Sequence, residues 1–167
     1  NGSVLDLRGG TIQQNKAVNG GGVAAYAGTV TQLKMSGNAE IVNNSALNYG
    51  NGAYFINVSR GSANIHPLLV MEGNAAIDTN NPAYFENVLS GQIPVEVSAP
   101  LKTMGTAAIL EFSDDFWISV NEGKEIIRFS AANAVVQENK FALDSSSWYL
   151  KEDAVYLELQ KFADNPL

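Results

Sequence analysis

The sequence has no cysteine, a single histidine and few charged residues, and these shortages exclude several kinds of chemistry. Without cysteine the chain forms no disulfides, no thiolate metal sites and no cysteine nucleophile. Charged residues make up 16% of the chain, well below the roughly 25% of an average globular protein. Amide and hydroxyl side chains therefore have to supply much of the polar surface.

Basic residues and long apolar runs are also scarce. The net charge is −7, and the ten Lys and Arg residues are scattered along the chain. Binding to nucleic acid or to an anionic membrane is therefore not expected, because both need clustered positive charge. No segment approaches the roughly 18 apolar residues of a membrane span. The chain starts at Asn1 without an initiator Met or a leader, so we expect a piece of a longer protein.

An internal repeat dominates the first half of the sequence. Residues 35–44 (MSGNAEIVNN) recur 36 residues later as residues 71–80 (MEGNAAIDTN), and residues 10–15 form a partial third copy. A second motif recurs every 30 residues, at 21–26, 51–56 and 81–86. Two motifs that repeat in the same order at this period indicate the coils of a solenoid.

Short apolar runs bounded by Gly and Asn predict strands rather than helices throughout the chain. The predicted strands lie at 4–7, 11–12, 23–26, 30–35, 40–42, 93–97, 107–112, 125–129, 141–143, 148–150 and 155–159. Residues 57–67 interrupt the repeat and predict an exposed loop, and residues 130–137 are the best candidate for a short helix. We expect one domain over residues 1–167, with regular repeats at 1–86, irregular coils and a cap at 87–160, and a frayed tail at 161–167.

Asn15, Asn44 and Asn80 occupy equivalent positions at the predicted coil corners. Asn tolerates the backbone geometry of a corner and hydrogen-bonds to nearby main chain. We therefore expect the amides to stack as a structural ladder; the alternative is a polar ligand groove.

The alternation of residues 20–26 (GGGVAAY) with residues 35–44 resembles the repeats of bacterial surface proteins built as right-handed parallel β-helices. These include adhesin-like and polymorphic outer-membrane-type proteins. Residues 71–81 and the Trp-Tyr-Leu segment at 148–150 resemble the last regular repeat and the C-terminal region of that group. The resemblance implies an all-β, right-handed parallel β-helix with irregular C-terminal coils that form a cap. It also implies an extracellular or bacterial cell-surface location.

Parallel β-helices include polysaccharide lyases and hydrolases, so carboxylates were considered as catalytic groups. The candidates are Asp6, Glu40, Glu72 and Asp78 in the repeats, and Glu111 with Asp114 and Asp115 further on. Glu40 is equivalent to Ala76, and Asp78 to Val42, so the repeat carboxylates are not expected to stack. Asp114 and Asp115 are expected to form a solvated turn before an aromatic strand. His66 is expected to be an exposed residue of a loop. We therefore expect no catalytic residue, metal or cofactor.

Tyr26, Tyr54 and Tyr84 recur largely in register with Phe55 and Phe85. A structural aromatic stack is the favoured interpretation, and a strip of tyrosines that stack on sugar rings is the alternative. The expected function is a non-enzymatic, adhesin-like binding or display module, with a glycan or a host or extracellular protein as partner. A carbohydrate-active enzyme and a pure structural spacer remain as alternatives.

Overall fold

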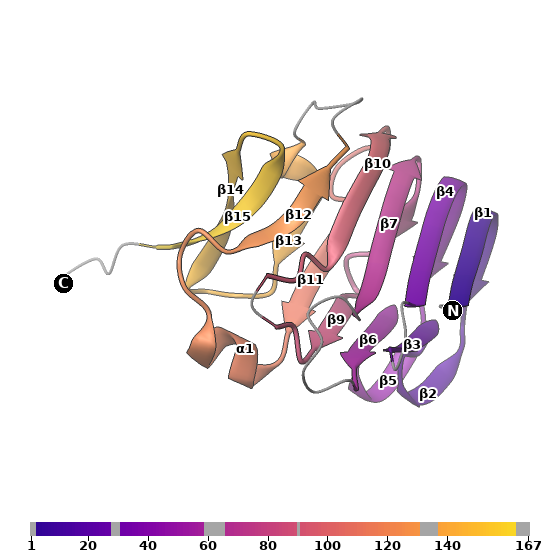
Figure 1. Cartoon of the computed structure of the whole chain (residues 1–167). Coiled ribbons are helices and arrows are strands. Elements are labelled where there is room, and N and C mark those ends of the chain that lie inside the picture. Colours follow the sequence, from indigo (N-terminus) through magenta and orange to yellow (C-terminus); the bar gives the residue numbers. More distant parts are fainter. Residues whose placement is uncertain (1–2, 28–30, 59–65, 90, 131–136, 163–167) are drawn as a thin grey trace.

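The chain is wound as a parallel β-solenoid of about four turns, which confirms the predicted fold class (Figure 1). The computed structural model describes residues 3–27, 31–58, 66–89, 91–130 and 137–162. Its elements are, in order, β1 (Ser3–Gln13), β2 (Lys16–Asn19), β3 (Val23–Ala27), β4 (Thr31–Val42), β5 (Ser45–Tyr49), β6 (Ala53–Asn57), β7 (Pro67–Gly73), β8 (Ala76–Ile77), β9 (Ala83–Glu86), β10 (Val95–Leu101), β11 (Ala108–Phe112), α1 (Asp114–Ser119), β12 (Glu125–Phe129), the 3-10 helix η2 (Glu138–Lys140), β13 (Phe141–Leu143), β14 (Trp148–Asp153) and β15 (Tyr156–Lys161).

Successive coils place their strands side by side in two main sheets. The first sheet has the order β1-β4-β7-β10-β12-β15-β14, with β8 also paired to β4. The second sheet has the order β13-β11-β9-β6-β3, and β2 and β5 form a separate two-stranded sheet. The pairings are parallel up to β12, after which β15 pairs antiparallel with both β12 and β14. This hairpin covers the C-terminal end of the solenoid, where the sequence predicts a cap (Figure 1).

The core is built from like residues of successive coils. Leu33 pairs with Leu69 and Met35 with Met71 in the first sheet, and all four side chains are buried. In the second sheet the rings of the register partners Phe55 and Phe85 stack 4.7 Å apart. Each coil thus buries its apolar face against the next one.

The predicted asparagine ladder is present, with one correction. The main-chain N and the Nδ2 of Asn15 both donate to Asn44 Oδ1 at 3.0 Å. The main-chain N of Asn44 donates to Asn81 Oδ1 at 2.6 Å, so the third rung is Asn81 and not Asn80. Asp78 explains the shift, because its Oδ1 accepts the Asn80 N–H at 2.8 Å and closes a turn that holds one additional residue.

The second half also departs from the sequence prediction. Asp114 and Asp115 form the first turn of α1, and not a turn before a strand. Carboxylates suit the first turn of a helix because the helix dipole is positive there, and Phe116 anchors α1 by stacking on Phe112 at 4.4 Å.

Three local predictions fall largely on residues outside the described ranges. Most of the predicted loop at 57–67 lies there, although its end residues belong to β6 and β7. The helix candidate at 130–137 lies mostly outside the described ranges, and residues 163–167 of the predicted tail lie wholly outside them. Lys161, which the sequence assigns to the tail, is the last residue of β15.

A candidate cleft of tyrosines and carboxylates

The outer face of the second sheet carries a cluster of tyrosines. Tyr54 and Tyr84 are register partners on β6 and β9, as the sequence predicts, and their rings lie 6.0 Å apart. Side chains alternate along a strand, so these two rings point outward while Phe55 and Phe85 point into the core. Tyr54 is covered by neighbouring side chains and is only 4% exposed, whereas Tyr84 is half-buried.

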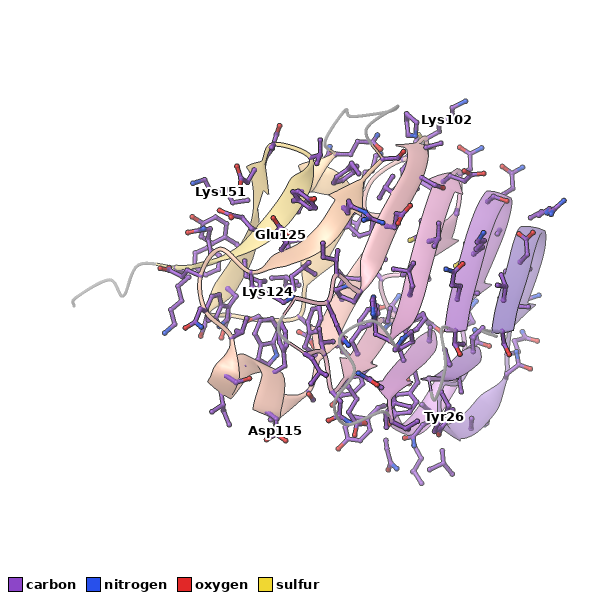
Figure 2. The ribbon with its side chains drawn as sticks, viewed as in Figure 1. Tyr26, Lys102, Asp115, Lys124, Glu125 and Lys151 are labelled. Atoms are coloured by element: carbon purple, nitrogen blue, oxygen red, sulfur yellow. The ribbon has the colours of Figure 1, made fainter. Side chains whose placement is uncertain are left out.

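Tyr26 does not occupy the same position as the other two predicted tyrosines. It pairs with Ile56, and Ala24 is the residue opposite Tyr54. Tyr26 therefore lies two residues further along the strand, on the same outer face, with its ring edge-on to Tyr54 at 5.8 Å. It is 56% exposed and lies at the lower border of the molecule as viewed in Figure 2.

Sequence reasoning missed a fourth member of the cluster, Tyr49. Its ring stacks on Tyr84 at 4.6 Å and is 46% exposed. Tyr49 ends β5, outside both repeated motifs, so periodicity gives no signal for it. The one local hint is its place directly before Gly50, where the coil turns toward β6.

A cleft of about 360 Å³ lies beside this cluster. Three carboxylates line it: Glu86 from β9, and Asp114 and Asp115 from the start of α1. The other lining residues are Tyr49, Tyr84, Asn87, Phe112 and Ser113. The Tyr54 hydroxyl donates a hydrogen bond to Glu86 Oε2, which fixes the orientation of that carboxylate. Aromatic rings and hydrogen-bond acceptors thus meet in one concave surface.

The hydroxyls of Tyr54 and Tyr84 stay protonated because the pKa of each is raised. Burial, helped by the neighbouring Tyr49 and by the charges of Glu86, Asp114 and Glu111, raises the pKa of Tyr84 to about 12. Burial and the hydrogen bond to Glu86 raise the pKa of Tyr54 as well. Both hydroxyls therefore act as hydrogen-bond donors at ordinary pH.

Two further carboxyl groups meet next to Tyr84. Glu111 on β11 is the register partner of Tyr84 on β9. Asp144 directly follows β13, the strand that pairs with β11 on its other side, and so lies next to Glu111. Burial, together with a hydrogen bond to Asp144 and its charge, raises the pKa of Glu111 to about 7. Such a hydrogen-bonded pair is closer than the roughly 5–9.5 Å that separates the carboxyl groups of glycoside hydrolases.

The other predicted carboxylates and the histidine do not line the tyrosine cleft. Asp6 forms an ion pair with Arg8 at 2.7 Å, and Glu72 accepts a hydrogen bond from Ser98. Glu40 pairs with Ala76, as predicted. His66, predicted as an exposed loop residue, is half-buried just before β7.

A larger groove of about 560 Å³ lies on the outer face of the first sheet. It contains Asp6, Arg8, Lys34, Glu72 and Glu96, with charges of both signs. Among its lining residues, Asp6 and Arg8 pair with one another, and Glu96 pairs with Arg128. No aromatic side chain lines it, so the tyrosine cleft is the stronger candidate.

The stacked coils and shared registers define the class of protein, a parallel β-solenoid. No protein-family model matches the chain, and neither does any curated protein or solved structure. Within the described ranges, no group of three or more His, Asp or Glu side chains is arranged to hold a metal ion. No helix in the described part of the chain has the length and apolar character needed to cross a membrane.

Proposed function

We propose that this solenoid is a non-enzymatic glycan-binding module, displayed outside the cell as an adhesin-like region of a larger bacterial surface protein. The observation that carries the proposal is the cleft of about 360 Å³ between Tyr49, Tyr84 and the carboxylates of Glu86, Asp114 and Asp115. Sugars present apolar C–H faces that pack on aromatic rings and hydroxyl groups that donate to carboxylates. The proposed surface location is supported by the likeness of the repeats to those of bacterial surface proteins.

The scaffold suits such a role because part of the cleft is built on paired strands. Tyr84 and Glu86 belong to β9, which pairs on both sides, with β6 and with β11. Side chains on paired strands are held more precisely than side chains on loops, and a preorganised site loses less entropy when a ligand binds.

The test is titration of the purified chain against a panel of immobilised glycans, with Tyr49→Ala as the diagnostic variant. Tyr49 is 46% exposed, so its removal should leave the fold intact. We expect saturable binding that weakens about tenfold in this variant, as for loss of an aromatic anchor worth about 1.4 kcal/mol. Tyr149→Ala is the matched control, because Tyr149 is also partly exposed but lies on the capping hairpin.

Absence of binding across the panel by the folded chain would contradict the proposal and favour a structural spacer. Equal loss of binding in both variants would also contradict it, because the cleft would then not be the binding surface.

A further inference from the structure

We infer that the tyrosine cleft selects sugars that carry a free ammonium group, such as glucosamine oligomers, over N-acetylated or carboxylate-bearing sugars. The inference rests on the proposed function and names the chemical class of its ligand. It is drawn from the charge and the aromatic character of the cleft taken together.

The cleft is negatively charged, and no basic residue in the described part of the chain lines it. Glu86, Asp114 and Asp115 line it, and no Lys or Arg is among the lining residues. The ion pairs found in the described ranges, Arg8–Asp6 and Arg128–Glu96, both involve strands of the first sheet. A ligand with positive charge would supply the missing counter-charge.

Figure 2 shows where the labelled charged residues lie. Asp115 projects from the lower border, as does Tyr26. Of the labelled lysines, Lys102 and Lys151 lie in the upper half of the view, and Lys124 lies lower, above α1. Because no described Lys or Arg is among the lining residues of the cleft, an approaching cation meets its carboxylates first.

The aromatic wall favours the same ligand. Ammonium groups are attracted to the electron-rich faces and hydroxyl oxygens of tyrosine, and the Tyr49 and Tyr84 rings stand beside the carboxylates. The sugar ring attached to the ammonium group would pack its C–H face against these rings. Neutral sugars would lose the ionic contact, and uronates would be repelled by like charge.

The carboxylates converge from separate elements, which makes the cleft more than an acidic helix start. Glu86 lies on β9, and its orientation is held by the Tyr54 hydroxyl, so Tyr54 is a positioning residue. Asp114 and Asp115 come from α1, which Phe116 anchors to Phe112. Strand and helix thus bring three carboxylates to one concave surface beside two tyrosine rings.

The experiment is calorimetric titration of the full chain with three oligomers of equal length: glucosamine, N-acetylglucosamine and galacturonate. The pH is set so that the glucosamine amines are protonated. We expect the glucosamine oligomer to bind about tenfold or more tightly than the N-acetylated oligomer, with affinity that falls as salt is added. The galacturonate oligomer should bind least.

The diagnostic variant is Asp114→Asn with Asp115→Asn, and the matched control is Glu152→Gln with Asp153→Asn. Both double variants remove two carboxylate charges, but Glu152 and Asp153 are exposed on β14. We expect the first to weaken glucosamine binding about tenfold and to leave binding of the N-acetylated oligomer unchanged. The control should alter neither.

The two proposals fail in different ways. Equal affinity for the glucosamine and N-acetylated oligomers would overturn the inference and leave the proposed function standing. Equal loss in both double variants would also overturn the inference, because net charge alone would then drive binding. Absence of binding to all three oligomers would overturn the inference, and only silence on the wider glycan panel would overturn the proposed function.

Discussion

Asn44 is the central rung of the asparagine ladder. Its side chain bonds to the coil before it, and its main-chain N bonds to the coil after it. Its Oδ1 accepts both Asn15 donors, its Nδ2 donates to the Ile12 carbonyl at 2.8 Å, and its main-chain N reaches Asn81. Replacing Asn44 with Ala would remove the partner of both Asn15 donors and of the Ile12 carbonyl, and would leave the main-chain bond to Asn81 in place. We expect Asn44→Ala to lower the free energy of unfolding by about 2 kcal/mol, measured by urea denaturation.

Asn80→Ala is the control for this prediction. Asn80 is exposed and outside the ladder, so its loss should change stability by less than about 0.5 kcal/mol. Similar losses in the two variants would argue against the ladder and against the assignment of Asn81 as its third rung.

Glu111 should make stability depend on pH. Its carboxyl group binds a proton up to about pH 7 in the folded chain, compared with an ordinary value of 4.5. The folded state therefore holds more protons than the unfolded state between these values, and its stability falls as pH rises through them. Because Glu111 is only half-buried, water screening limits the loss to about 1 kcal/mol.

Urea denaturation between about pH 5 and pH 8 checks this prediction. Glu111→Gln has no titrating group at this position, so its stability should fall less with pH than that of the native chain. Parallel profiles for the two proteins would contradict a raised pKa at Glu111.

The corner before β6 depends on close contact between coils. A Cβ added at Gly52 would overlap the Asn81 carbonyl oxygen and lie 2.7 Å from Ile77 Cγ2. The coils would have to separate, so Gly52→Ala should lower the free energy of unfolding by about 1–3 kcal/mol. Gly9→Ala should be nearly neutral, because nothing lies within 4 Å of a Cβ added there. Thermal unfolding of both variants measures the difference, and equal melting temperatures would refute this account of the corner.

Elements that repeat were predictable from sequence, because identical residues meet in register. Met35 and Met71 pair as the repeat indicates, and so do Phe55 and Phe85. A single additional residue in the turn at Asp78 was enough to move the ladder from Asn80 to Asn81. α1 has six residues, too few to produce a recognisable helical period.

The candidate cleft was only partly predictable, for a physical reason. Tyr84 lies in a repeated motif, but Tyr49 and Asp114 come from segments that repeat nothing. Winding the coils brings these segments together, and a solenoid repeat specifies its core positions while its outer positions vary freely. Knowledge of the repeat therefore predicts that Tyr54 and Tyr84 are neighbours, and not which residues surround them.

The first and the last described strands of the first sheet differ in their pairing, and this difference should govern how the chain opens when it is studied in isolation. The described strands pair with β1 on one side only, and Val4 and Leu5 on β1 are 54% and 45% exposed. At the opposite end β15 and β14 cover β12. In stacked repeats each coil is stabilised mainly by its neighbours, so a coil with one neighbour opens more readily than a coil with two.

Hydrogen exchange followed by mass spectrometry tests this asymmetry. We expect amides of β7 and β10, which pair on both sides, to exchange slowest, and amides of β1 to exchange at least about tenfold faster. Strands β12 and β15 should resemble the central coils, because the antiparallel hairpin closes that end. Uniform exchange along the chain would instead mean that the solenoid unfolds as one cooperative unit, with no separate opening of its first coil.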